Sequence, residues 1–583
     1  MGKIIRNESN TYPRPKNSCR GTHGYIYLNV SNSYENGKND HDKVNIGILT
    51  DPSDPECKTI YANDNYFRYF SPKSLPERPD YADSISVGGH EVVSHVAKES
   101  GLESTLKEVF KESDVHLILD LSSYMLLQES AVFQHFPHWA RSHKLFSRTI
   151  RSDSYVSKFL KTEISVPQIN KFKTLWAKSV IGDGRVFLCY DSTNVNSQAE
   201  GVFIVQKGHA KDRTDLPQVN TDYVVRQKDG LPVTFNEFPG SVTDIAEAPE
   251  MFNFFKNIIG DTEVEITMVC DRGYISEDNL KELTDSKIHY LMLLRTTFGE
   301  YDTILEKHIQ DVKLYSNYIE EYGTYGITRT GKLGENDVFF HIFHDSTLEQ
   351  KHLEILHRDI KSMKSELLKA VERKTKYTAL ELGRFQKWFD LTIMEAEKIV
   401  VKQRGKAKNK KAEVDSYTIL SFKPNDQKIA VEQHKCGFYI LVGDQKLSAV
   451  EAKQAMSKRD CVEKTFEALK SSLGMEKYGV YTGNSIFGKS LIWFVASILH
   501  SLVHDAIRPL YEKDSKSYTV NAVLDLIEEI VVDRDLTTND FKRRYQLTKK
   551  QKEILNKFNL SGDDIDISAS ELSKNLPVYD ARV

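Results

Sequence analysis

Short apolar runs bounded by Gly, Pro and Asn dominate the middle of this 583-residue chain. They occupy residues 186–190, 202–206, 265–270 and 289–294, and a helical pattern at 247–258 separates the second run from the third. Apolar runs of this length are typical of buried strands. Because strands that alternate with helices build α/β folds, we expect a mixed sheet flanked by helices.

Composition limits the class of protein. Hydrophobic residues make up 40% of the chain and charged residues 28%, which suffices for more than one core and excludes a collagen-like or wholly disordered chain. The net charge of −4 excludes a uniformly basic nucleic-acid binder, so any DNA contact must come from local basic patches. The six cysteines form no CxxC pair, which argues against a zinc site or a dense disulfide framework.

The pattern along the chain predicts six segments. They are 1–88, a disordered start with a small β unit and a linker; 89–182, helical, for DNA binding or as a brace; 183–299, the first part of the sheet core; 300–435, a long insertion; 436–510, the second part of the core; and 511–583, helical, for DNA binding or dimerisation. Residues 1–18 lack the apolar core of a signal peptide. The apolar stretch Leu491–Leu499 is too short to span a membrane and predicts a buried helix.

Acidic residues directly follow two of the predicted strands. Asp191 comes after the run 186–190, and Asp271 comes after 265–270. The carboxyl ends of strands in open α/β sheets are where ligands bind, and two neighbouring carboxylates there can hold a divalent cation. The alternative is that each Asp only caps the turn that follows its strand.

A third carboxylate lies on the helix predicted at 456–470. At 100° per residue, Arg459, Glu463 and Lys470 fall within about 40° of one another on one face of that helix. An apolar stripe lies beside them and would pack on the sheet; it consists of Val462, Phe466 and Leu469. The alternative is a solvated Arg459–Glu463 pair with no role in chemistry.

Taken together, these residues resemble the catalytic core of bacterial insertion-sequence transposases of the DDE, RNase H-like superfamily. The similar group carries a Tyr-x2-Arg-x3-Glu-x6-Lys signature, whose last three positions match Arg459, Glu463 and Lys470. Met456 stands at the Tyr position, a departure that bears on a phosphate contact there but not on the carboxylates. The sequences DSTN and DRGY around the two Asp residues also look like the family's, and the resemblance covers about residues 185–510.

The resemblance implies an RNase H-like sheet interrupted by the insertion before the catalytic Glu. It also implies a transposase that cuts DNA at the ends of an insertion sequence and joins them to target DNA, with Asp191, Asp271 and Glu463 as catalytic residues. Two Mg²⁺ ions, for which Mn²⁺ would substitute, would be bridged by Asp191 and held separately by Asp271 and Glu463. Arg459 and Lys470 would contact the DNA backbone.

The implied partners are double-stranded DNA, as terminal inverted repeats and target, and a second copy of the chain in the DNA complex. The implied location is the bacterial cytoplasm at the nucleoid, without membrane association. Two alternatives stay open: a catalytically inactive relative that only binds DNA, and an RNase H-like nuclease without strand transfer.

Further basic and aromatic residues are weaker candidates for DNA contacts. Arg272 follows the second Asp, and basic runs lie at 402–411 and 541–552; each is equally well explained as solvated surface. Trp388 is a candidate for stacking on a displaced base, with a core tryptophan as the alternative.

Overall fold

The computed structural model describes residues 11–35, 38–70, 83–208, 216–260, 264–402, 411–535, 538, 540–574 and 578–579. The chain forms two compact units, Met1–Asp80 and Tyr81–Val583, which are described separately.

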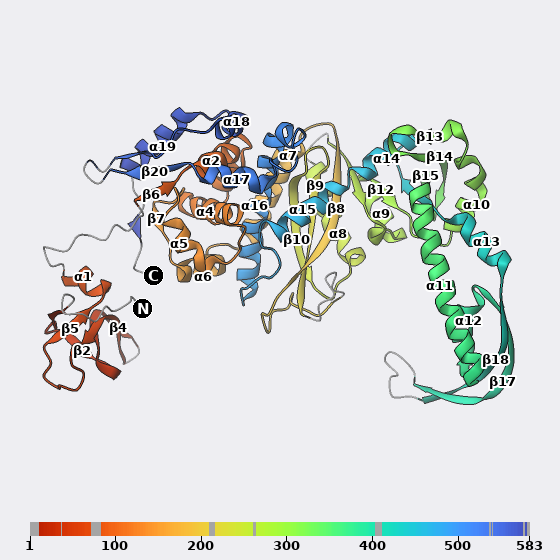
Figure 1. The fold of residues 1–583 in the computed structure, drawn as a ribbon, viewed down its shortest axis with the longest axis horizontal. Coiled ribbons are helices and arrows are strands. Elements are labelled where there is room, and N and C mark those ends of the chain that lie inside the picture. Colours follow the sequence, from red (N-terminus) through yellow and green to blue (C-terminus); the bar gives the residue numbers. More distant parts are fainter. Residues whose placement is uncertain are drawn as a thin grey trace. The chain divides into compact units, whose positions relative to one another are not determined.

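The first unit is a five-stranded sheet with the order β1-β5-β4-β3-β2. Its elements are β1 (Thr11–Pro13), β2 (Ser18–Arg20), β3 (Tyr25–Glu35), β4 (Lys38–Leu49), β5 (Thr59–Ala62) and α1 (Asp64–Phe70) (Figure 1). Strands β1 and β2 lie in the stretch that the sequence pattern leaves without structure, and they pair with β5 and β3. Residues 1–10 and most of the expected linker lie outside the described residues.

The second unit contains a mixed sheet of nine strands, in the order β10-β9-β8-β11-β12-β19-β15-β14-β13. Its strands are β8 (Arg185–Asn196), β9 (Gln218–Arg226), β10 (Leu231–Pro239), β11 (Glu265–Cys270), β12 (His289–Leu293), β13 (Tyr318–Ile319), β14 (Thr324–Leu333), β15 (Asn336–Asp345) and β19 (Phe438–Gly443). The pairs β8–β11 and β11–β12 are parallel, whereas the other pairs are antiparallel. The predicted α/β fold with a mixed sheet is therefore confirmed.

One predicted strand is wrong. The run 202–206 forms no strand, and Phe203 within it is 78% exposed. The chain instead forms the hairpin β9–β10, whose turn contains Asp229 and Gly230. Gly230 has a φ of 73°, a backbone conformation that favours glycine, and an Asp-Gly pair between two strands is a strong hairpin signal.

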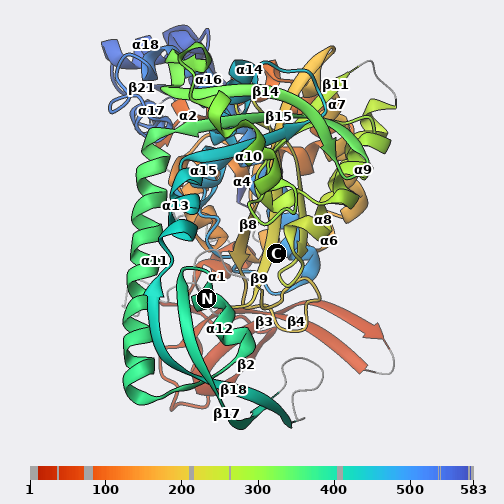
Figure 2. The same ribbon diagram turned by 90° about the vertical axis from the view of Figure 1, so that its right-hand side faces the viewer.

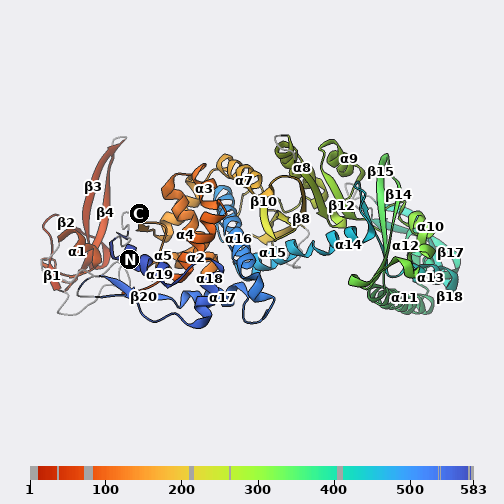
Figure 3. The ribbon, with the colours of Figure 1, turned by 90° about the horizontal axis from the view of Figure 1, so that it is seen from above.

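Helices cover both faces of this sheet (Figure 3). On one face lie α8 (Asp244–Ile259) and α9 (Glu277–Asp285), and on the other α15 (Asp460–Ser471), which follows α14 (Ala449–Ser457). Phe252 of α8 contacts the ring of Tyr190, whereas Phe466 of α15 contacts the ring of Tyr223. Tyr190 and Tyr223 point to opposite faces of the sheet, and each packs against a helix on its own face.

The long apolar helix α16 (Gly483–Tyr511) forms the centre of the second unit's core. Its length and composition would suffice to cross a membrane, but 78% of its most apolar window is buried inside the unit. It packs against α4 (Glu112–Gln128), α6 (Asp153–Thr162) and β10. The prediction of a buried helix is confirmed.

The predicted helical segments at the two ends of the second unit form one layer. The first contributes β6 (Ser84–Ser86), α2 (Gly88–Glu99), α3 (Leu102–Lys107), α4, α5 (Phe136–Ala140), α6 and α7 (Val166–Ile181). The second contributes α17 (Val520–Glu528), β20 (Val531–Arg534), β21 (Phe541–Arg543), α18 (Lys549–Lys557) and α19 (Gly562–Lys574). Strand β20 pairs with both β6 and β21, and α17 and α19 pack on α2.

The segment 300–435, expected as one insertion, contains two groups of elements. Residues 301–345 form α10 (Tyr301–Val312) and the strands β13 to β15, which extend the main sheet. The part with its own sheet and core begins at α11 (Ser346–Arg373) (Figure 2). Its other elements are β16 (Lys376–Thr378), α12 (Ala379–Gln386), β17 (Phe389–Lys402), β18 (Lys411–Pro424) and α13 (Asp426–Lys435).

Candidate active site

The register of β8 and β11 brings the two predicted aspartates together. Asp271 directly follows β11 as predicted, whereas the predicted strand end at Asp191 is wrong, because β8 continues to Asn196 in its pairing with β9. Tyr190 and Cys270 are partners in this parallel pair, so Asp191 and Asp271 follow side by side. Neighbouring strands lie about 4.8 Å apart, which places the two residues within reach of a common group.

The alternation of β8 aims Asp191 at α15. Tyr190 faces the other way, where its ring contacts Tyr274 and its hydroxyl donates a hydrogen bond to Asp222 Oδ2 (2.8 Å). Asp191 shares its face with Cys189, which hydrogen-bonds with Cys461 of α15. This contact between the two thiols joins β8 to α15. Cys189 lies two residues before Asp191, and Cys461 lies two residues before Glu463.

Asp271 also caps the turn that follows β11. Its Oδ1 accepts a hydrogen bond from the backbone N–H of Arg272 (2.7 Å), as the capping alternative predicts. Arg295, just beyond β12, holds the same turn, because its guanidinium donates to the carbonyls of Arg272 (2.5 Å) and Gly273 (2.7 Å). Our sequence reasoning missed Arg295, although it follows the fourth apolar run.

Glu463 lies in the first turn of α15, and the predicted apolar stripe is confirmed because Val462, Phe466 and Leu469 are buried. The predicted continuous helix over 456–470 is wrong, since the chain turns between α14 and α15. Three N–H groups there donate to the carbonyl three residues earlier, which tightens the backbone. Met456 consequently belongs to α14, and Arg459 stands at the start of α15.

Arg459 connects two of the three carboxylates, Asp191 and Glu463. Its Nη1 donates to Asp191 Oδ2 (3.2 Å), and its Nη2 forms an ion pair with Glu463. Burial of the guanidinium acts to lower its pKa, but the charges of Asp191, Asp271 and Glu463 raise the pKa of Arg459 overall. The structure thus brings Asp191 and Glu463 into contact with Arg459 and places Asp271 beside Asp191 on the neighbouring strand.

The donor set suits a hard divalent cation, because it consists of three carboxylates, one within β8, one directly after β11 and one on α15. Within the described parts of the chain, however, no three His, Cys, Asp or Glu side chains stand at metal-binding spacing. The guanidinium of Arg459, with a side chain 15% exposed, lies between Asp191 and Glu463 instead. The chemistry of the site therefore fits a metal, whose binding requires Arg459 to release these oxygens.

The remaining candidates lie apart from this cluster. Lys470 is seven residues after Glu463, about 10 Å further along α15. Arg272 is exposed on its turn. Trp388 is 5% exposed in the insertion's own core, which confirms the core alternative.

The two basic runs predicted as DNA contacts differ in what the structure describes of them. Residues 403–410 of the first run lie outside the described residues. In the second run, Arg543 pairs with Asp566 and Arg544 pairs with Asp533, so these arginines tie the C-terminal layer together.

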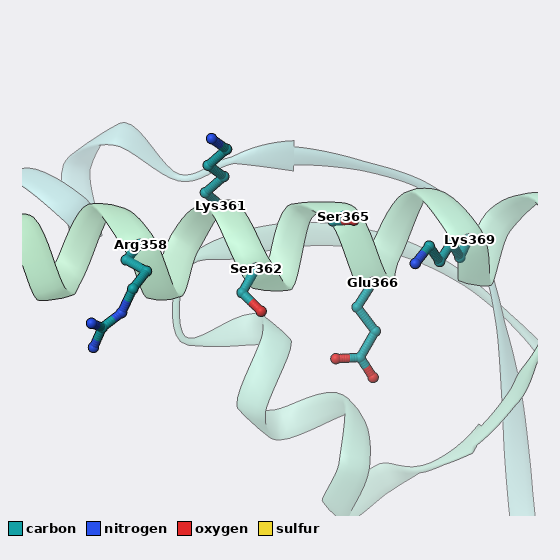
Figure 4. Close-up of a pocket in the computed structure, with 6 residues that line it drawn as sticks. All are labelled: Arg358, Lys361, Ser362, Ser365, Glu366 and Lys369. Atoms are coloured by element: carbon teal, nitrogen blue, oxygen red, sulfur yellow. The ribbon is translucent and has the colours of Figure 1, made fainter.

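The insertion carries a separate basic surface on α11. A shallow hollow of about 500 Å³ lies along this helix, and its cationic side chains are Arg358, Lys361 and Lys369 (Figure 4). Glu366, which also lines it, forms an ion pair with Arg384 of α12. The hollow is made by α11 alone and contains none of the predicted catalytic residues.

Comparisons with known proteins show the family of the chain. Residues 182–499, more than half of the chain, match the family model described as "Transposase DDE domain". No curated protein matches the sequence. A solved structure of the piggyBac transposase synaptic complex with hairpin DNA is similar at 9% identity, covering 85% of this chain and 84% of that one, with a TM-score of 0.32, too weak a likeness to carry an argument. The matched segment holds all five predicted site residues, and the chain belongs to the transposase DDE-domain family.

Proposed function

We propose that this protein is an active, metal-dependent DNA transposase, with Asp191, Asp271 and Glu463 as its catalytic carboxylates. The observation that carries the proposal is that Arg459 pairs with both Asp191 and Glu463, while Asp271 lies beside Asp191 at the end of the neighbouring strand. Asp191 and Glu463 are more than 260 positions apart and meet at one cation only because β8 and α15 pack together there.

The strand order supports an RNase H-like core. The strands β10-β9-β8-β11-β12 place an antiparallel hairpin on one side of β8 and two parallel strands on the other. In this proposal, β14 and β15 extend that core, and the insertion proper begins at α11.

In the proposed reaction, Asp191 would be the shared ligand of the metal ions, and Asp271 and Glu463 would supply the other carboxylates. Bound Mg²⁺ or Mn²⁺ would activate the attacking oxygen and stabilise the leaving oxygen of the phosphodiester. Arg459, released from Asp191 and Glu463, pairs with a backbone phosphate beside the cut, and Lys470 pairs with one further along α15. The proposed DNA partners are the terminal inverted repeats and the target, and the proposed assembly is a homodimer in the bacterial nucleoid.

A plasmid assay tests the reaction. The substrate carries this gene with its native flanking DNA, together with a separate target plasmid. With Mg²⁺ the wild-type protein is expected to excise the element at both ends and join it to the target, and EDTA is expected to stop both steps. Excision without joining would support the nuclease alternative, and end binding without any cut would support the inactive DNA-binding alternative.

Arg459→Ala is expected to increase the stabilisation that Mg²⁺ provides. Without metal, the guanidinium offsets the repulsion between the carboxylates, so the variant should melt at a lower temperature in EDTA. Because Mg²⁺ no longer competes with the guanidinium, its addition should raise the variant's Tm by about 2 °C or more beyond the wild-type shift. Differential scanning fluorimetry with Mg²⁺ and with EDTA measures both quantities.

Lys464→Ala is the matched control for this experiment. Lys464 lies on the same helix and pairs with Asp460 (2.8 Å) on the solvated side. Its removal should leave the Mg²⁺ shift unchanged. Equal Mg²⁺ shifts in wild type and Arg459→Ala would contradict competition between metal and guanidinium.

A further inference from the structure

A second hollow, of about 440 Å³, lies behind the helix that carries Glu463. Its walls are α15, the turn between α14 and α15, α16 and the β9–β10 hairpin. Its cationic and imidazole side chains are those of Lys228, Lys458, Lys464, His500, His504 and Arg508.

The hollow and the carboxylates lie on opposite faces of α15. Cys461, Thr465 and Ala468 line the hollow. At 100° per residue, these positions are about 140–200° around the helix axis from Glu463. A molecule in the hollow would therefore not touch the carboxylate site, although it would touch the same helix.

The lining carries an excess of positive charge. Four cations face two carboxylates, Asp229 and Asp460. Asp229 is already bound by Arg226 (3.0 Å), and Asp460 is bound by Lys464 (2.8 Å).

Two of the lining cations have no such partner. The side-chain ammonium groups of Lys228 and Lys458 form no ion pair or hydrogen bond with the described residues, so their charges are available to a ligand. Arg508 pairs with Asp505 (2.6 Å), which is not part of the lining.

The histidines add neutral hydrogen-bonding groups on one wall. His500 and His504 are four residues apart on α16 and therefore point to the same side. Burial lowers the pKa of His500 to about 4, so at neutral pH its imidazole offers one N–H donor and one acceptor. The imidazole wall suits a ligand that has both hydrogen-bond donors and acceptors. The nearby lysine and arginine side chains suit a ligand that also carries negative charge.

We propose that this hollow binds a phosphate-bearing ligand of mononucleotide size. Its volume lies within the range of about 300–1,000 Å³ that is usual for small-molecule sites. Lys228 and Lys458 pair with the phosphate, and His500 and His504 contact the remainder of the ligand. The phosphate comes from a free nucleotide or from the end of a DNA strand, and the test distinguishes these sources.

Isothermal titration of the full chain in EDTA tests the proposal, since without metal the carboxylates repel a phosphate. The probes are AMP, inorganic pyrophosphate and adenosine. AMP and pyrophosphate are expected to bind and adenosine is not. Lys228→Glu and Lys458→Glu should each weaken AMP binding at least tenfold, whereas the control Lys446→Glu, an exposed lysine outside the hollow, should not.

Competition identifies the source of the phosphate. Displacement of AMP by a 5′-phosphorylated duplex, but not by the same duplex without the phosphate, assigns the site to a DNA end. Displacement by neither assigns it to a free nucleotide. The proposal is overturned if AMP and pyrophosphate bind more weakly than about 1 mM, or if AMP binding survives both Lys228→Glu and Lys458→Glu. Because binding is measured directly, this result does not depend on whether the protein cuts DNA.

Discussion

Asp271→Asn is expected to lower the rate of DNA cleavage at least about 1,000-fold, a loss of about 4 kcal/mol of transition-state stabilisation. Asparagine keeps the size of the side chain, and its carbonyl oxygen can still accept the hydrogen bond from Arg272 N–H. The turn after β11 should therefore keep its shape. What the variant loses is one of the three negative charges that the proposed metal ions require.

Two further measurements make this result specific. The Tm and the affinity for element-end DNA should stay close to those of wild type, since Arg459 keeps its partners Asp191 and Glu463. Asp278→Asn is the control, because Asp278 is exposed in the first turn of α9 and faces no member of the site. If Asp271→Asn cleaved at the wild-type rate, the assignment of the catalytic carboxylates would be wrong.

Trp493→Ala is expected to lower the free energy of unfolding of the second unit by about 3–5 kcal/mol. Trp493 is fully buried in α16, and its indole N–H donates to the carbonyl of Leu473 (3.0 Å), just beyond α15. Its ring contacts Tyr478, and the ammonium of Lys489 lies 4.8 Å from the ring centre. Alanine would leave a cavity and an unpaired carbonyl where α16 supports the catalytic helix.

Thermal unfolding followed by circular dichroism measures this loss. Phe203→Ala is the control, since Phe203 is also aromatic but 78% exposed, and its removal should change the stability by less than about 0.5 kcal/mol. If Trp493→Ala had the same Tm as wild type, the inference that α16 stabilises the core of the second unit would be wrong.

Local signals carried the prediction of the carboxylates. Asp191 and Asp271 each follow a run of apolar residues, and this pattern indicates a strand that ends at a carboxylate. The strand end is confirmed for Asp271, whereas β8 continues past Asp191 because the polar residues after it pair with β9. Glu463 was predicted from helical spacing, because the apolar stripe beside it requires that face to pack on the sheet.

The local pattern of residues did not show which strands pair with one another. The run 202–206 is as apolar as a strand, but strand pairing was taken by the hairpin β9–β10 around Gly230. The segment 301–345 was assigned to the insertion because nothing in its composition shows that β15 pairs with β19. Pairing between distant strands depends on contacts that periodicity does not encode.

The amino-acid sequence by itself determined the α/β class, the strand end before Asp271, the helix with Glu463 and the burial of α16, because each follows from the spacing of residues along a single element. Only the tertiary structure decided that the guanidinium of Arg459 lies among the carboxylates and that a cationic hollow forms behind α15. Both features join residues from strands and helices far apart in the chain, so their contacts exist only after the elements have packed.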